Sequence, residues 1–308
     1  MLRYLLSRLL QALLVIVVVY TITFLLLMLV GDPFIGEKTP PESVLKALRA
    51  RYMIDRPAMA YLLYPWRVIT TGDLGPTISY ENWTVNDVVR SALPVSASLG
   101  CFAMIWALWL GIVAGLVGGM KPQSKRDLLL TILSLLGASL PTFVIASALV
   151  MLLGVFVPIF PTGGWGTIAQ LILPSFCLAL PFAAYIARLT RVSVLEVRHQ
   201  DYIRAARAKG VTHFPLVTRH VLRNALLPVF SYLGPALAYL ITGSFVVEKV
   251  FAIPGLGTHF VNACLATDIP LVLGLVLIFT SVVVIFNLLV DVAYTFVDPR
   301  VSVEGNKS

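Results

Sequence analysis

The chain has 308 residues, of which 58 % are hydrophobic and only 12 % are charged, and its formal net charge is +8. Because soluble domains carry about 25 % charged residues, this composition excludes a soluble globular protein and indicates an integral membrane protein. The sequence pI near 9.5 would also suit a nucleic-acid-binding protein, but the long apolar segments of the chain exclude that role.

Five long blocks contain no Asp, Glu, Lys or Arg. A helix needs about 20 apolar residues to cross the ~30 Å hydrocarbon layer of a membrane. The third block (128–187) is roughly twice too long for one crossing, and its Pro- and Gly-rich stretch from Pro158 to Gly166 divides it in two. The sequence therefore predicts an all-α, polytopic membrane protein with six transmembrane helices. The predicted spans are 9–30, 95–120, 128–157, 168–187, 226–247 and 269–290.

The first apolar block follows Arg3 and Arg8, which is also the charge pattern of a signal peptide. Its apolar run over residues 9–30 exceeds the about 7–15 residues of a typical signal-peptide core, and no A-x-A cleavage site follows it. We therefore expect a retained first span.

Two connecting segments are strongly basic. Residues 121–127 carry three basic residues against one acid, and residues 188–225 carry eight against two. Since positive loops stay in the cytoplasm, segment 188–225 is expected to be a cytoplasmic loop and both termini are expected inside. Loop 31–94 then lies outside, and residues 1–308 form a single transmembrane domain.

An amphipathic helix is predicted within the outer loop. It starts near Pro41 and places Val44, Leu45 and Leu48 on one face. Such a helix suits a lid or a docking surface, and it equally suits a spacer packed on the membrane face.

Signatures of catalysis or metal binding are missing from the sequence. None of the patterns G-x-x-x-x-G-K-[ST], H-E-x-x-H or G-x-S-x-G occurs, and the four histidines lack metal-ligand spacing. Cys101, Cys177 and Cys264 lie in or beside apolar segments, without C-x-x-C pairing, and are interpreted as small buried hydrophobes. We therefore expect a non-enzymatic chain with no catalytic residue, no metal and no bound cofactor.

Acidic residues are expected only at the ends of spans, as with Asp291 at the close of the last one. Ion-coupled carriers keep ionisable groups at mid-membrane depth. A self-sufficient secondary carrier or channel is therefore the less favoured alternative, and the energy for transport is expected from another subunit. A membrane-anchored sensor or scaffold, whose basic loop binds lipid or protein, is a third class.

The basic loop contains the alanine-rich stretch DYIRAARAKG at residues 201–210. Asp201 is predicted to cap a helix over residues 202–209, and Gly210 is predicted to end it in the left-handed conformation. Ala205 and Ala206 are small, so the surface of a partner can approach the backbone closely. The other candidate contacts are Tyr202, Arg204, Arg207 and Lys209, whose basic members offer donors to acidic groups or to lipid phosphates.

This stretch resembles the coupling-loop signature of binding-protein-dependent ABC importers, E-A-A-x-x-x-G followed by I-x-L-P. Ala205, Ala206 and Gly210 match in register, whereas Arg204 replaces the glutamate. The later element reads HVLR at residues 220–223, so its proline is also replaced. Both departures match the peptide-importer branch of the family, in which the stretch resembles YIR-x-ARAKG followed by RH-x-L-x-x-ALLP.

Other segments extend the resemblance to the oligopeptide permease subunits of these importers over nearly the whole chain. They are GDPFIGEKTPPE (31–42), GDLGP (72–76), PVSASLG (94–100), SYLGPA (231–236), ITGSFVVEKVFAIPGLG (241–257) and DVAYTFVDPR (291–300). Dipeptide, glutathione and nickel permeases are similar enough to stay alternatives.

The resemblance implies a type I ABC importer permease fold in the bacterial inner membrane. It implies a second homologous six-span permease subunit, two ATP-binding subunits that carry ATP and Mg²⁺, an external solute-binding protein and surrounding lipid. The helix within 201–210 would lie in a cleft of the ATPase and couple ATP-driven closure to the spans. The substrate-binding residues stay unassigned.

A second candidate site lies in FAIPGLG at residues 251–257. Pro254, Gly255 and Gly257 are expected to prevent a regular helix there, which predicts an apolar re-entrant turn on the outer side. This turn would border an outer gate or meet the binding protein. A constrained connector is the alternative interpretation.

Overall fold

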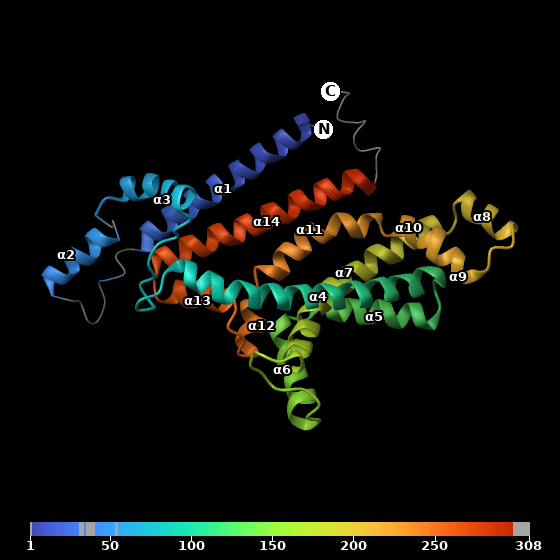
Figure 1. The fold of residues 1–308 in the computed structure, drawn as a ribbon. Coiled ribbons are helices and arrows are strands. Elements are labelled where there is room, and N and C mark those ends of the chain that lie inside the picture. Colours follow the sequence, from blue (N-terminus) through green and yellow to red (C-terminus); the bar gives the residue numbers. More distant parts are fainter. Residues whose placement is uncertain (1, 31–33, 35–40, 53–54, 298–308) are drawn as a thin grey trace. The chain divides into compact units, whose positions relative to one another are not determined.

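The protein, described here by a computed structural model that covers residues 2–30, 34, 41–52 and 55–297, is built from helices (Figure 1). Within these residues the only strand-like feature is an isolated bridge between Pro76 and Thr84. The all-α class predicted from the sequence is confirmed.

Five helical segments of the described chain are long and apolar enough to cross a membrane, and a bent pair makes six if it is counted as one span. The five are α1 (Leu2–Val30), α4 (Val85–Met120), α7 (Ile168–Val197), α11 (Leu227–Ile241) continued by α12 (Phe245–Val250), and α14 (Ile269–Val297). The bent pair is α5 (Lys125–Ser139) and α6 (Thr142–Val150) with its π-helical extension η1 (Met151–Phe156).

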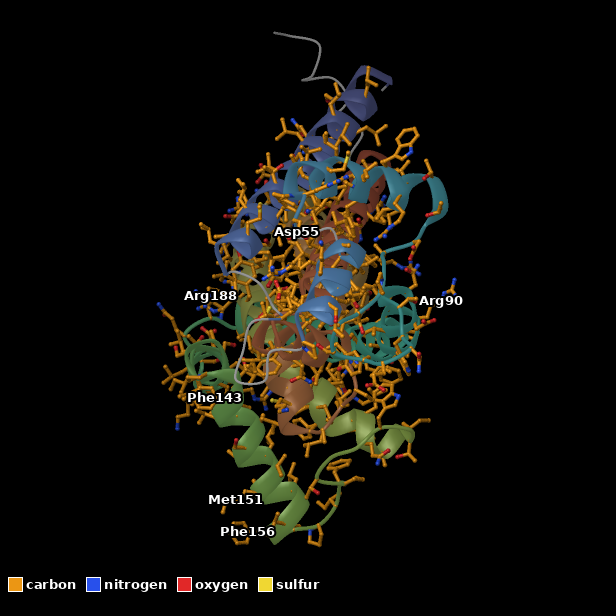
Figure 2. The ribbon with its side chains drawn as sticks, turned by 90° about the vertical axis from the view of Figure 1, so that its left-hand side faces the viewer. Asp55, Arg90, Phe143, Met151, Phe156 and Arg188 are labelled. Atoms are coloured by element: carbon orange, nitrogen blue, oxygen red, sulfur yellow. The ribbon has the colours of Figure 1, made fainter. Side chains whose placement is uncertain are left out.

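The third predicted span, 128–157, is not straight. The chain bends by 106° between its two halves, because Leu140 adopts an extended conformation before Pro141, as residues that precede proline do. Pro141 then starts α6 from its N-cap position. Figure 2 shows Phe143, Met151 and Phe156 along α6 and η1, where all three side chains are exposed.

The predicted outer loop, 31–94, contains two helices and the start of a third. The expected amphipathic helix is α2 (Glu42–Arg51), with Pro41 at its N-cap, and the sequence interpretation missed α3 (Pro57–Thr71). Helix α4 already begins at Val85, ten residues before the predicted span. Residues 31–33, 35–40 and 53–54 of this loop lie outside the described chain.

The described residues divide into two compact units, each with its own core. The first comprises residues up to 94 together with 255–284, and the second comprises 95–254 together with residues from 285 onward. The predicted single-domain organisation stays a prediction. Fully buried side chains of the second unit include Leu99, Leu173, Ile186, Leu240 and Phe251.

A stripe of glycines brings α4 against α7 in the second unit. A Cβ atom at Gly115 would lie 2.5 Å from the Ala187 carbonyl oxygen, and one at Gly119 would lie 2.7 Å from the Val194 Cβ. Gly111, one turn earlier, meets Ile186 in the same way. Small residues four apart allow this close approach of membrane helices, whose association depends on van der Waals packing.

Of the three cysteines, only Cys177 is buried; Cys101 and Cys264 are exposed on this chain. The interpretation of all three as buried hydrophobes is therefore wrong for two of them. Apolar surroundings in the sequence do not show whether a side chain faces the protein or its surface.

In the first unit, two polar side chains fix the segment that precedes α4 against α13 (Leu256–Leu265) and the start of α14. The buried Asp268 carboxylate accepts hydrogen bonds from the backbone N–H groups of Ile78 and Ser79, both at 2.8 Å. The Tyr80 hydroxyl lies 2.9 Å from His259 Nδ1. Burial lowers the pKa of His259 below its ordinary value, so its neutral form is favoured in the folded state.

Substituting Gly115 by alanine tests the α4–α7 contact. We expect Gly115→Ala to lower the free energy of unfolding by about 1–3 kcal/mol, because backbone and Thr190 atoms of α7 occupy the space for the methyl group. The matched control is Gly137→Ala in α5, where the nearest atom lies at 3.4 Å. Thermal unfolding of the purified variants measures both, and equal stability of the two variants would contradict close α4–α7 packing.

Acidification tests the environment of His259. In the unfolded chain the His259 side chain binds a proton near pH 6.5, whereas in the folded unit it binds that proton only at lower pH. The contribution of His259 is therefore fully present above about pH 6.5 and is lost as the pH falls toward its folded pKa. We expect the unfolding temperature to fall between pH 7.5 and 5.5, and to fall less in His259→Asn, whose amide does not titrate. An identical pH profile in the two proteins would show that His259 is not the titrating group.

Candidate functional site

The predicted coupling segment forms helix α8 (Asp201–Ala208), one turn beyond the end of α7. The N-cap position is held by Gln200, without a side-chain hydrogen bond, so the prediction that Asp201 caps the helix is wrong by one residue. Asp201 lies instead in the first turn, where a carboxylate is favourable beside the positive end of the helix dipole. Its side chain is almost fully exposed and lies 3.4 Å from Arg204 Nη1.

The end of α8 has the hydrogen bonds of a Schellman motif. The Val211 N–H donates to the Ala206 carbonyl oxygen at 3.2 Å, and the Gly210 N–H donates to that of Arg207 at 3.0 Å. Gly210 has φ +79°, which confirms the predicted left-handed residue. Glycine adopts this conformation without the strain that a Cβ atom brings.

The side chains of α8 divide into a buried and an exposed face. Ile203 and Ala206 are buried, and they pack with Val194, Leu216 and Val221 in a small core. The sequence interpretation counted Ala206 among the residues open to a partner, but its methyl group faces its own subunit. The exposed members of the predicted set are Tyr202, Arg204, Ala205, Arg207, Lys209 and Gly210.

Two polar contacts anchor the segment around α8. Asn224 Nδ2, in α10 (Leu222–Ala225), donates to the Tyr202 hydroxyl oxygen at 2.7 Å. Arg198 Nη1, between α7 and α8, donates to the Gly119 and Met120 carbonyl oxygens at the end of α4. After α8, the chain returns to α11 through α9 (His213–Pro215), η2 (Leu216–Val221) and α10.

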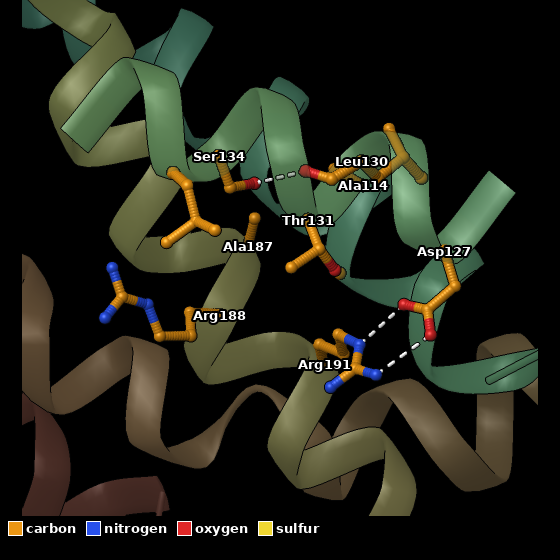
Figure 3. Close-up of a pocket in the computed structure, with 10 residues that line it drawn as sticks. Ala114, Asp127, Leu130, Thr131, Ser134, Ala187, Arg188 and Arg191 are labelled. Carbon is orange, nitrogen blue, oxygen red and sulfur yellow. Dashed lines mark hydrogen bonds and ion pairs between the residues drawn. The ribbon is translucent and has the colours of Figure 1, made fainter. Parts of the chain in front are cut away.

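An ion pair that the sequence interpretation missed joins α5 to α7. Arg191 Nε and Nη2 donate to the two Asp127 carboxylate oxygens at 2.6 and 2.9 Å (Figure 3). Asp127 also accepts from the Gln123 backbone N–H at 2.9 Å, and it is buried. The sequence held a signal for this pair. Asp127 and Arg188 flank the uncharged block 128–187, and two predicted spans within that block bring its two ends, and with them Asp127 and the nearby Arg191, to the same membrane boundary.

Together these contacts hold α8 rigidly to its own subunit while leaving one face open. That face carries three cations, Arg204, Arg207 and Lys209, around a single acid, Asp201. The arrangement suits contact with the surface of a partner, and the anchoring contacts of α8 lead to α7 and α10.

In the second candidate site, FAIPGLG, the helical structure is interrupted as predicted, but not all of the proposed residues cause the interruption. Helix α12 ends at Val250, and Ala252 has φ +51°. Pro254 is exposed, and Gly255 is the extended N-cap residue of α13. Gly257 is buried inside α13, so it does not prevent a regular helix there.

A buried carboxylate precedes this segment. Glu248 in α12 is fully buried and accepts a hydrogen bond from Ser96 Oγ at 2.8 Å. Gly243, with φ +90°, lies against the same carboxylate and has no room for a side chain. Glu248 lies at the end of its span, as expected of an acid, but it is not solvent-exposed there.

Metal binding was not expected, and within the described ranges no group of three or more His, Cys, Asp or Glu side chains comes together to hold an ion. The expected lack of a metal or cofactor stays a prediction.

The chain is similar to known transport proteins over nearly its whole length. The family described as "Binding-protein-dependent transport system inner membrane component" matches residues 107–303. The oligopeptide transport system permease protein OppB of Haemophilus influenzae is 40 % identical over 305 residues, which cover 98 % of this chain and 99 % of that protein.

Two further relatives have similar coverage. OppB of Escherichia coli K12 is 40 % identical over 304 residues, covering 98 % of this chain and 99 % of that protein. The dipeptide transport system permease protein DppB of Bacillus subtilis is 38 % identical over 302 residues, covering 98 % of each.

Among solved structures, the crystal structure of an amino acid ABC transporter with histidines aligns with a TM-score of 0.50 and 16 % identity. The alignment covers 70 % of this chain and 94 % of that one. At this identity the likeness concerns the fold alone, and it agrees with the type I permease fold expected from the sequence.

Proposed function

Because the chain belongs to the family of inner membrane components of binding-protein-dependent transport systems, we propose that it forms half of the pathway by which an ATP-driven importer carries oligopeptides across the cytoplasmic membrane. The observation that carries this proposal is α8: an anchored helix with an open basic face, in a chain whose sequence has no nucleotide-binding motif. The similarity to OppB over 98 % of the chain supports oligopeptides as the substrate class.

The chain itself is proposed to be non-catalytic and to bind no cofactor. Its proposed partners are a second six-span permease subunit, two ATPase subunits that hold ATP and Mg²⁺, and an external solute-binding protein. The basic segment around α8 supports a cytoplasmic position for this helix. We propose six crossings, with both termini on the cytoplasmic side.

ATP-driven closure of the ATPase pair would displace α8 as a rigid body. Its buried face, Ile203 and Ala206, moves with the core that it shares with α7 and η2. The Asp127–Arg191 pair and the α4–α7 glycine contact extend that body to α5 and α4. A displacement at α8 therefore tips several spans together, which is how a bistable packing converts a ligand bound elsewhere into alternating access.

Dipeptide import by the same architecture is the second candidate, since DppB of B. subtilis is 38 % identical. The names of the relatives favour peptides over the glutathione and nickel alternatives. Uptake of labelled dipeptides and longer peptides by cells with and without the chain separates the two candidates.

Ala205→Glu tests docking on α8. The side chain is exposed, so we expect insertion and assembly with the sister permease to persist. A bulky charge on the docking face should reduce both ATPase co-purification and peptide uptake by about tenfold or more. The same substitution at exposed Ala58 in α3 is the matched control.

Ala206→Glu has a different expected result, because it would bury a charge in the small core under α8. It should lower the unfolding temperature of the whole protein, which Ala205→Glu should not. Normal peptide uptake by Ala205→Glu would rule out the docking role of α8. Purification of the wild-type chain without any ATPase, in a form that still transports peptide, would rule out the importer itself.

A further inference from the structure

A cavity of about 160 Å³ lies between α4, α5 and α7, beside the Asp127–Arg191 pair (Figure 3). Its polar lining includes Arg188, Arg191, Thr131 and Ser134, and leucine side chains of α5, Leu130 and Leu135, form part of its apolar wall. The mechanism proposed above does not use this cavity.

The charges around the cavity are unbalanced. Arg191 is neutralised by Asp127, whose two oxygens it binds. Arg188 extends from α7 in the opposite direction in Figure 3, and the described part of the chain supplies no acid or other hydrogen-bond partner to it. The lining of the cavity therefore contains two guanidinium groups and one carboxylate, which leaves the positive charge of Arg188 uncompensated.

Of the two hydroxyl groups that line the cavity, one has a hydrogen-bond acceptor within the described chain and the other has none. Ser134 Oγ donates to the Leu130 carbonyl oxygen at 2.8 Å. For the Thr131 hydroxyl, the described residues provide no acceptor. A guanidinium fork and a hydroxyl donor beside an apolar wall match a phosphate oxygen carried on an apolar molecule.

The position of the cavity at a membrane boundary narrows the ligand further. Asp127 and Arg188 flank the uncharged block 128–187, so both lie where that block meets the polar phase. Apolar side chains of α5, such as Leu128, Ile132 and Leu136, are exposed and offer apolar surface on the helix that walls the cavity. Basic cavities between membrane helices at the cytoplasmic boundary are sites for anionic lipid head groups.

We propose that this cavity binds the phosphate group of an anionic phospholipid from the cytoplasmic leaflet, with Arg188 as its main ligand and the acyl chains along α5. This inference rests on the proposed orientation of the chain. A lipid bound there lies against α7, the helix that leads into α8, so transport would depend on anionic lipid.

The test uses the complete importer in lipid nanodiscs of phosphatidylcholine, with and without phosphatidylglycerol. Native mass spectrometry measures how much phosphatidylglycerol stays bound to wild type, Arg188→Gln and the control Lys125→Gln, which removes an exposed cation of α5 that does not line the cavity. We expect Arg188→Gln to retain about tenfold less phosphatidylglycerol, because the substitution removes one charged hydrogen-bonding group. Lys125→Gln should retain the wild-type amount. Arg188→Lys should restore part of the retention.

Equal retention by wild type and Arg188→Gln would overturn the proposal. Inorganic phosphate that displaces the bound phosphatidylglycerol from wild type would also overturn it, because the site would then belong to a free anion. Parallel loss in Lys125→Gln would show only general attraction to an anionic surface and would also overturn it. Co-purification of the ATPases and unfolding temperature are measured on the same samples, so a misfolded variant or a failure of the importer assignment is recognised separately.

Discussion

The close contact of α4 with α7 is the constraint on which the rest of the second unit depends. At Gly111, Gly115 and Gly119 the two helices approach so closely that a single methyl group has no space. Inside a membrane the hydrophobic effect does not drive helices together, so contacts of this kind provide much of the association. Since α7 leads into the predicted coupling segment, the glycine stripe also fixes α8 relative to the spans.

The Asp127–Arg191 pair strengthens this arrangement at one end. Asp127 is buried, but the Arg191 side chain is about one-third exposed, so the pair is not isolated from water. Two parallel hydrogen bonds give it a defined geometry, which an exposed pair such as Asp201–Arg204 lacks. The pair therefore holds the start of α5 to the C-terminal part of α7, where a force applied at α8 would arrive first.

Features that depend on the local chain were predictable from the sequence. Uncharged blocks of sufficient length indicated the spans, because a helix must satisfy its backbone hydrogen bonds internally when it crosses lipid. Gly210 indicated the end of α8, because few other residues adopt φ +79° without strain. The resemblance to known permeases added the family, which no periodicity could have given.

Features that depend on tertiary packing were not predictable. Ala205 and Ala206 are identical in type, and only the register with Ile203 decides which of them is buried. Gly257 was predicted to interrupt a helix, yet it lies within α13, since a helix tolerates glycine when its neighbours pack closely. The burial of Glu248 likewise depends on neighbouring elements. The bend at Pro141, by contrast, has a local cause in a proline that was visible in the sequence.

The small size of α8 makes its anchoring part of its proposed function. A helix of 8 residues is too short to be stable alone in water, since nucleation costs more than one or two turns return. Its shape comes from the buried Ile203 and Ala206, from the Schellman motif and from the Tyr202–Asn224 hydrogen bond. The contacts that fold α8 are therefore the same contacts that attach it to α7 and α10. A partner that displaces the exposed face of α8 would therefore displace α7 and α10 as well, unless the helix unfolded. In the proposed mechanism, this lets so short a helix transmit a displacement to the spans.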